Sequence, residues 1–146
     1  MKVQIKILDQ RLHEMMPRYA TNGSAAFDVV ACIQTDYLLM YPGEHERVGL
    51  GFEIAIPAGY MGVLAPRSSK GEQGLVLANT VGIIDSDYRG EIKASLWNRS
   101  NDKLVIVPLE RIAQMMIVPV VQAEFEVVDE LTATVRGSGG FGSTGK

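Results

Sequence analysis

The sequence predicts an all-β barrel or sandwich, and three observations lead to this fold class. Short segments of β-favouring residues follow one another and are separated by turn residues such as Pro42-Gly43, Gly51 and Pro57-Ala58-Gly59. Residues 3–8 alternate with the period of two that is typical of a half-buried strand. No long segment has the 3.6-residue period of an amphipathic helix, and only residues 68–73 are expected to hold one short helical turn.

Each expected strand is a short apolar or alternating run between turns. After residues 3–8 we expect strands at residues 25–31, 38–40, 46–50, 52–56, 60–64, 81–84, 92–97, 104–107, 110–120 and 125–128. Residues 136–146 contain five glycines, and ordering such residues costs about 1–2 kcal/mol each. The sequence therefore predicts a single β-barrel domain over residues 1–135 and a mobile C-terminal segment over residues 136–146.

The composition is that of one ordinary domain. With 146 residues, of which 47% are hydrophobic, the chain can build a real core. The formal net charge of −3 argues against a nucleic-acid binder with a basic surface, although a local anion site is possible. The single cysteine, Cys32, lies among apolar residues and suits a reducing compartment. No apolar run approaches the roughly 20 residues that span a bilayer, so we expect a cytoplasmic protein, in the host cytoplasm if it is viral.

The stretch from Thr80 to Glu91 places two aspartates, an aromatic residue and an arginine after apolar strand residues. Gly82 and Gly90 permit backbone shapes or close approaches that a side chain would forbid. Asp85 stands where a strand would deliver a carboxylate to the edge of a cavity. One interpretation is an active-site turn, and the other is an ordinary hairpin whose polar residues simply favour the turn.

Three polar residues are embedded in apolar strands. Asp28 lies within residues 25–31, and an unpaired carboxylate there would be costly to bury, so we expect a metal, an arginine or backbone donors as its partner. Arg111 and Gln114 lie within residues 110–120 and must also find partners. These residues are either structural staples or parts of a site. The two histidines, His13 and His45, stand apart, so histidine ligation of a metal is not expected.

A second polar constellation follows an apolar strand directly and reads Ala65-Pro66-Arg67-Ser68-Ser69-Lys70-Gly71. Arginine offers a fork of donors suited to phosphate, and neighbouring hydroxyls and backbone N–H groups can complete an anion cradle. A solvated loop is the alternative interpretation.

The tail carries a lone aromatic residue, Phe141, among glycines, with Arg136 before it and two hydroxyl residues after it. Aromatic stacking and phosphate capture would explain this pattern, which predicts a lid over an active site. The alternative is a disordered tail. A Walker A loop is excluded because no Gly-Lys pair is followed by Ser or Thr and a helix.

Taken together, these segments resemble the trimeric deoxyuridine triphosphatase (dUTPase) family, which hydrolyses dUTP to dUMP and pyrophosphate. The resemblance runs from about Ser24 to Gly145. It rests on five motifs in the family's order: residues 25–31, 66–69, 82–90, 111–114 and 136–145. Two departures, Ala26 and Ser69, stand where the family often has glycine, and both are small residues. The resemblance implies a distorted β-barrel or jelly-roll fold.

The resemblance also implies a mechanism. Asp85 is implied to be the base that orients and deprotonates a water for in-line attack on the α-phosphorus, a role that typically contributes ~10²–10⁴-fold. Mg²⁺ is the implied cofactor, with Asp28 holding it through water. Further implied substrate-binding residues are Arg67, Ser68, Ser69, Gln114, Arg136, Gly142, Ser143 and Thr144.

Base and sugar selection are implied to come from the central stretch. A hairpin over residues 75–84, including Asn79, Gly82 and Ile84, is implied to present hydrogen-bonding groups to uracil. Tyr88 is implied to lie against the deoxyribose and Phe141 to stack on uracil. The resemblance implies a homotrimer with shared active sites, with dUTP as the partner molecule and neither nucleic acid nor membrane.

Two other functions compete with this interpretation. A dCTP deaminase resembles this fold, but its catalytic glutamate and Arg-Gly-Ser run in the second motif are missing. A non-catalytic regulatory or interaction protein on the same scaffold is the other rival, and the intact Asp85 argues against it.

Overall fold

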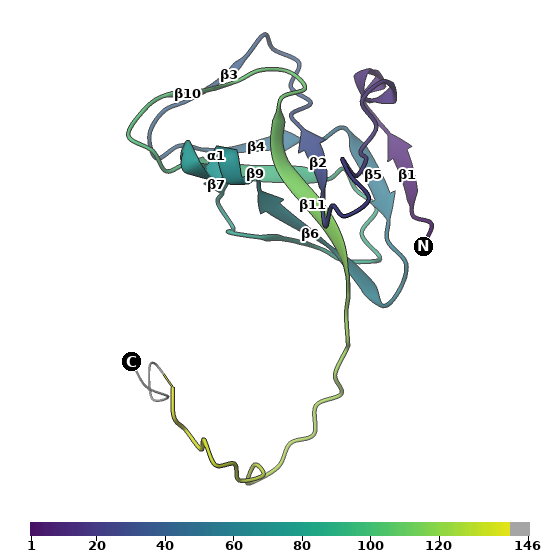
Figure 1. The fold of residues 1–146 in the computed structure, drawn as a ribbon, viewed down its shortest axis with the longest axis vertical. Coiled ribbons are helices and arrows are strands. Elements are labelled where there is room, and N and C mark those ends of the chain that lie inside the picture. The colour runs from purple at the N-terminus through teal and green to yellow at the C-terminus, as the bar shows by residue number, and fades with distance from the viewer. Residues whose placement is uncertain (141–146) are drawn as a thin grey trace.

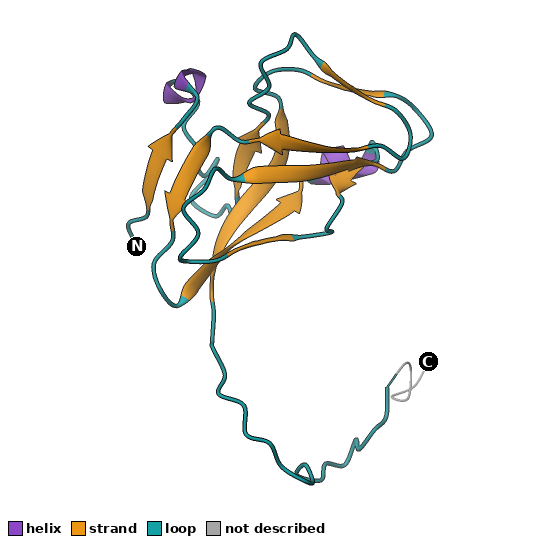
Figure 2. Cartoon of the chain, turned by 180° about the vertical axis from the view of Figure 1, so that it is seen from behind, coloured by secondary structure: helices purple, strands orange, loops and turns teal. Residues whose placement is uncertain are grey.

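The computed structural model describes residues 1–140, and residues 141–146 lie outside the described part. The chain forms a β body with two short helical segments and a long C-terminal arm (Figures 1 and 2). The elements are β1 (Gln4–Ile7), η1 (Gln10–His13), β2 (Phe27–Val30), β3 (Leu38–Met40), β4 (His45–Gly49), β5 (Phe52–Ala55), β6 (Tyr60–Pro66), α1 (Ser68–Glu72), β7 (Leu75–Leu77), β8 (Gly82–Ile84), β9 (Lys93–Asn98), β10 (Leu104–Ile106) and β11 (Arg111–Pro119). The predicted all-β class and the short helix after residue 67 are confirmed.

Four antiparallel sheets make up the described body. The largest has the strand order β2-β11-β6-β8, and a three-stranded sheet has the order β4-β9-β7. Two ribbons, β1-β5 and β3-β10, complete the body. Strands distant in sequence thus become neighbours, and β11 lies between β2 and β6 in the largest sheet (Figure 1).

The core lies between these sheets. Alternate residues of β2, β6, β9 and β11 point inward, as the period-two pattern requires, and Val29, Leu64, Leu96 and Met115 are buried. Asn98 is the one buried polar side chain recorded in residues 1–140, and its amide donates to the Met40 carbonyl oxygen at 3.0 Å and the Asp102 carbonyl oxygen at 2.8 Å. No helix within residues 1–140 is long and apolar enough to cross a membrane.

The predicted strand at residues 125–128 is wrong. After β11 the Val120 N–H donates to the Gly59 carbonyl oxygen at 2.8 Å, and the chain then leaves the body as an extended arm (Figures 1 and 2). Phe125 is 91% and Val127 98% exposed. The residue types favour β structure, but a strand needs a neighbour for its backbone N–H and C=O groups, and the described chain supplies none there.

Candidate active site

A cavity of about 400 Å³ lies beside β8 and brings together five residues predicted for the site. They are Asn79, Gly82, Ile84, Asp85 and Tyr88. The cavity is also lined by Arg47, Glu91 and Lys93, which the sequence interpretation missed. Arg47 comes from β4 and Lys93 begins β9, whereas Glu91 ends the stretch that begins at Thr80. No sequence signal indicates that β4 and β9 border the turn after β8.

The two glycines of this stretch are explained by close approaches. A Cβ atom at Gly82 would lie 3.1 Å from the Leu64 Cβ on the paired strand β6. A Cβ atom at Gly90 would overlap the Tyr88 hydroxyl, which donates to the Glu91 carbonyl oxygen at 3.1 Å. Gly90 therefore lets the Tyr88 ring fold back along its own turn and stand at the cavity.

Asp85 follows β8 directly and is exposed. Its backbone carbonyl accepts a hydrogen bond from the Tyr88 N–H at 3.2 Å, which closes the turn. Arg89 fixes the same turn by donating to the Ser86 carbonyl oxygen at 2.7 Å and the Tyr88 carbonyl oxygen at 2.8 Å. No donor within residues 1–140 is recorded for the Asp85 carboxylate, so this side chain can accept a hydrogen bond from a ligand or water.

The connection between β7 and β8 differs from the implied hairpin. β7 pairs with β9, whereas β8 pairs with β6, so residues 75–84 pass from one sheet to another. Thr80 makes the turn with a left-handed φ of 60°. The expectation of a paired hairpin at residues 75–84 is therefore wrong, although Asn79 and Gly82 still reach the cavity.

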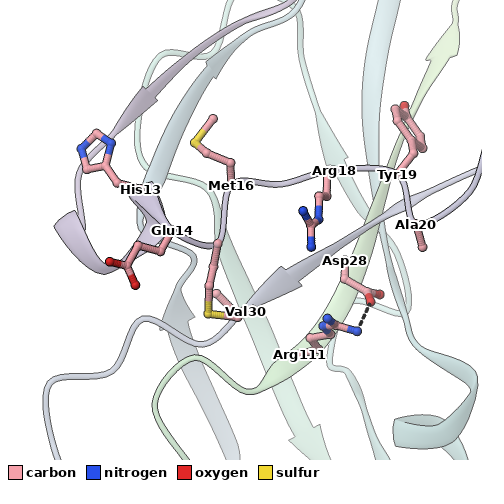
Figure 3. Close-up of a pocket in the computed structure, with 10 residues that line it drawn as sticks. His13, Glu14, Met16, Arg18, Tyr19, Ala20, Asp28, Val30 and Arg111 are labelled. Carbon is pink, nitrogen blue, oxygen red and sulfur yellow. Dashed lines mark ion pairs between the residues drawn. The ribbon is translucent and has the colours of Figure 1, made fainter.

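A second cluster lies at the far end of β6 and centres on Asp28. The Asp28 Oδ1 accepts a hydrogen bond from the Arg67 Nε at 2.8 Å. Its Oδ2 lies 3.6 Å from the Arg111 Nη1, and Figure 3 marks this ion pair with a dashed line. The partners of Asp28 are therefore arginines, which is one of the alternatives that the sequence left open. Because Arg67 uses its Nε for Asp28, its two terminal nitrogens are left to meet an anion.

Gln114 joins the second and fourth motifs. In the sheet it lies opposite Asp28 on one side and Ala65 on the other. Its side-chain amide donates to the Pro66 carbonyl oxygen at 2.8 Å. This hydrogen bond fixes the backbone immediately before Arg67, so Gln114 acts as a staple, as one of the two sequence-based interpretations proposed.

The serines of the second motif begin α1. Ser68 and Ser69 are exposed, and Arg67 precedes them in an extended conformation with φ −77° and ψ 145°. The chain therefore changes from strand to helix at Arg67, and two exposed hydroxyl residues follow this arginine directly.

A larger cavity, of about 630 Å³, adjoins this cluster (Figure 3). Asp28 and Arg111 line it together with the connecting segment before β2, including His13, Arg18 and Tyr19. Arg18 adds a cation that the sequence interpretation did not single out. It stands in an irregular segment whose path over β2 cannot be inferred from periodicity.

The two clusters are separated within one chain. Asp28 lies on one edge strand of the largest sheet and Asp85 directly follows the other edge strand. Along β6, the register places Asp85 beside Met61, whereas Arg67 lies six residues farther on, or roughly 20 Å at ~3.3 Å per residue. One chain therefore does not bring Asp85 to Arg67.

The remaining predicted residues belong to the C-terminal segment. Arg136 lies in the arm, where its Nε donates to the Gly139 carbonyl oxygen at 3.2 Å. Phe141, Gly142, Ser143 and Thr144 lie outside the described residues.

The donors present suit a metal ion only through water. Residues 1–140 contain no group of three or more His, Cys, Asp or Glu side chains that could hold one. Asp28 offers a single carboxylate that already pairs with arginine. Mg²⁺ keeps several waters and commonly takes one or two carboxylates plus substrate phosphates, so a water-mediated contact to Asp28 fits this chemistry.

Three titratable groups outside the site have shifted pKa values, and one of them is Arg11, whose pKa is raised by its hydrogen bond to Asp9. The Arg11 side chain hydrogen-bonds to Asp9 and lowers the pKa of that carboxyl to about 2. Burial raises the pKa of the Cys32 thiol to about 11, and the charge of Asp9 adds to the effect. At neutral pH the thiol stays protonated, which agrees with its interpretation as an unreactive cysteine.

Comparisons with known proteins agree with this arrangement. The sequence model of the dUTPase family matches residues 13–145. A deoxyuridine 5'-triphosphate nucleotidohydrolase of Paraburkholderia phytofirmans is 50% identical over 148 residues, covering 100% of this chain and 99% of the relative. The corresponding protein of Neisseria meningitidis serogroup A is 52% identical over 147 residues, covering 99% and 97%.

Solved structures give the same result for the fold. The dUTPase of Staphylococcus bacteriophage 80alpha, a G164S mutant with dUpNHpp, has a TM-score of 0.86 and 26% identity, with 99% of each chain covered. The dUTPase of phage phi11 of S. aureus, described with a structural Mg(II) ion, has a TM-score of 0.80, 21% identity and coverage of 91% and 100%, and supports the fold alone. With a family match over residues 13–145 and full-length relatives at 50% identity, the chain belongs to the dUTPase family.

Proposed function

We propose that this protein is a dUTP diphosphatase that converts dUTP and water to dUMP and pyrophosphate. The observation that carries the proposal is the cavity beside β8, where the Asp85 carboxylate, for which residues 1–140 supply no donor, stands with Asn79 and Tyr88. Relatives at 50% and 52% identity are named for this activity, and the bacteriophage 80alpha enzyme is described with dUpNHpp.

In the proposed reaction, Asp85 accepts a proton from a water. The water oxygen bonds to the α-phosphorus as the bond from that phosphorus to the bridging oxygen of the β-phosphate breaks, and pyrophosphate leaves. Proton acceptance requires a carboxylate that is not already paired, and the Asp85 side chain meets this requirement, whereas Asp28 does not. The water lies in line with the leaving pyrophosphate.

The cluster around Asp28 is proposed to bind the phosphates. The Arg67 guanidinium is oriented by Asp28 and donates through its terminal nitrogens, with the Ser68 and Ser69 hydroxyls beside it. Gln114 holds the preceding backbone in place. When bound, Mg²⁺ would neutralise phosphate charge, and Asp28 would hold it through water.

Tyr88 is proposed to select deoxyribose. Its ring is fixed by the hydrogen bond from its hydroxyl to Glu91 and by the space that Gly90 leaves. A ribose 2′-hydroxyl would meet this ring, so UTP is expected to be a poor substrate. Asn79, Gly82 and Ile84 are proposed to recognise uracil from the same cavity.

The separation of the two clusters supports a homotrimer with shared active sites. Asp85 of one chain and Arg67 of another must meet around one triphosphate, because in a single chain they lie at opposite ends of β6, roughly 20 Å apart. The arm also presents apolar side chains without cover, with Val121 93% and Leu131 87% exposed. Such surface is typical of a segment that packs on a partner.

The C-terminal segment over residues 136–146 is proposed to close over the site. Three side chains can donate hydrogen bonds to phosphate, those of Arg136, Ser143 and Thr144. Gly142 would let the backbone approach the nucleotide closely, and Phe141 can stack on the base. Removal of these residues is expected to lower turnover sharply without lowering the melting temperature.

The first test is pyrophosphate release by the purified protein with Mg²⁺, with dUTP, dTTP, dCTP and UTP in separate reactions. Release confined to dUTP would establish the substrate, the base and the sugar together. Ammonia release from dCTP would instead support a deaminase, and no release from any nucleotide would support a binding protein.

A further inference from the structure

An ion pair connects the segment that carries Arg67, Ser68 and Ser69 to the sheet. The family resemblance assigns no role to this pair. The Lys70 Nζ in α1 donates to the Glu110 Oε1, in the turn just before β11. Lys70 also donates to the Gln73 side-chain oxygen at 3.3 Å. Its charge is thus used within the chain and is not free to meet a phosphate.

Burial distinguishes this pair from an ordinary surface salt bridge. The Lys70 and Glu110 side chains are only 16% and 21% exposed, whereas the Lys6 side chain of the Lys6–Glu53 pair is 70% exposed. Exposed pairs contribute little because solvent screens them and their side chains lose freedom. A partly buried pair that loses one partner leaves a charge poorly compensated.

Glu110 is bonded to three parts of the phosphate cluster. Its backbone carbonyl accepts a hydrogen bond from the Ala31 N–H at 2.9 Å, directly after β2, which carries Asp28. Its Oε2 accepts from the Val107 N–H at 2.9 Å and closes the turn that leads into Arg111. Its Oε1 receives Lys70 from α1. One residue thereby connects β2, through its backbone carbonyl, with α1 and the turn before β11, through its carboxylate.

The helix that depends on this connection has little other support. α1 spans five residues, Ser68–Glu72, none of which is buried, and no side chain caps its N-terminus. So short a helix is not stable by itself and needs tertiary contacts. The Arg99 side chain approaches the Gly71 carbonyl oxygen at a long 3.4 Å. Among the side-chain bonds of residues 1–140, the Lys70–Glu110 pair is the one ion pair between α1 and the sheet.

We propose that Lys70 and Glu110 form a positioning pair that holds Arg67, Ser68 and Ser69 in register with Arg111 and Gln114. This inference rests on the proposed function, because its consequence for turnover requires that these residues bind the triphosphate. Neither residue is a catalytic residue, since both act through the groups that they hold in place. Misplacement of a binding group by about 1 Å can cost up to ~10²-fold in rate.

The test compares Lys70→Met, Glu110→Gln and the double variant, with Lys6→Met as the matched control that removes a lysine from an exposed pair. Each single variant is expected to lower kcat/KM for dUTP roughly tenfold, mainly through KM, and the double variant is expected to lose no more than either single one. Lys70→Arg, which keeps the charge, is expected to recover most of the loss.

A second readout does not depend on activity. The Gly71 and Gln73 N–H groups donate to the Arg67 carbonyl oxygen at 2.9 Å and the Ser69 carbonyl oxygen at 3.3 Å. Hydrogen exchange at these two amides is expected to accelerate in Lys70→Met and Glu110→Gln but not in Lys6→Met.

Three results would overturn the proposal. Unchanged exchange at both amides would show that the pair does not hold α1. A loss of kcat/KM no larger than that of Lys6→Met would show that the pair does not position the site. A loss in Lys70→Met that Glu110→Gln does not share would mean that Lys70 meets the phosphate directly. If the wild type releases no pyrophosphate, the proposed function fails. The hydrogen-exchange measurement then decides by itself whether the Lys70–Glu110 pair holds α1 in place.

Discussion

The two ends of β6 differ in how completely one chain prepares them. At the Arg67 end, the carboxylate of Asp28 is paired with arginine and the Gln114 side chain holds the backbone before Arg67. At the Asp85 end, the carboxylate has no recorded donor within residues 1–140 and stands beside a cavity of about 400 Å³.

This difference fits the different chemical tasks proposed for the two ends of β6. A binding surface for phosphates must be rigid before the ligand arrives, because organising it afterwards costs free energy. A base must instead keep its lone pairs available for the proton that it takes. The chain builds the first arrangement on paired strands and the second on a turn after an edge strand.

The largest expected effect is at Asp85. Asp85→Asn removes the proton acceptor and leaves the shape of the cavity, so turnover should fall at least ~10²–10⁴-fold while dUTP binding stays close to that of the wild type. Single-turnover kinetics and calorimetric titration with a non-hydrolysable analogue measure the two quantities. Full turnover by the variant would remove Asp85 from the base role.

A smaller effect is expected at Asp28. Asp28→Asn removes the charge that orients the Arg67 Nε, so kcat/KM should fall roughly 10–100-fold, with part of the loss in KM. Steady-state kinetics at several Mg²⁺ concentrations tests this. If Lys6→Met lowered kcat/KM by as much, the pairing of Asp28 with Arg67 would not be what prepares the phosphate site.

Gly90→Ala tests how the Asp85 end excludes ribose. The added methyl group would overlap the Tyr88 hydroxyl and push the ring away, so the preference for dUTP over UTP should fall about tenfold. Gly23→Ala is the control, because nothing lies within 4 Å of the added atom and φ there is not left-handed. Unchanged sugar selectivity in Gly90→Ala would contradict the role of Tyr88.

The smallest effect is expected for the Asp9–Arg11 ion pair, which lies outside both clusters. A change in this pair should affect the stability of the fold and not the activity. The pKa of Asp9 is lowered from 3.8 to about 2, so its pairing with Arg11 stabilises the fold above about pH 4 and is lost as the pH falls toward 2. Asp9→Asn should lower the melting temperature by a few degrees, about 3–6 °C, at pH 7 and leave dUTP turnover unchanged. The difference from wild type should shrink toward zero near pH 2, and a pH-independent difference would contradict the pairing.

Much of the fold followed from the sequence because burial imposes a period of two on half-buried strands. The turn with Asp85 and Tyr88 was predictable for a similar reason, since glycines and acids next to a strand mark a turn at a cavity. The strand at residues 125–128 was not predictable, because β-favouring residues do not specify where a partner strand comes from. Arg47 and Arg18 were missed because only the sheet pairing brings their segments to the cavities.

The most direct test of the account is whether two inactive chains can restore each other. Asp85→Asn and Arg67→Met chains are produced separately, mixed in equal amounts, unfolded, refolded together and assayed for pyrophosphate release from dUTP. If each site takes Asp85 from one chain and Arg67 from another, roughly a quarter of the sites in randomly mixed trimers should be intact, and activity should return. Activity no greater than the average of the two variants refolded alone would contradict a site shared between chains.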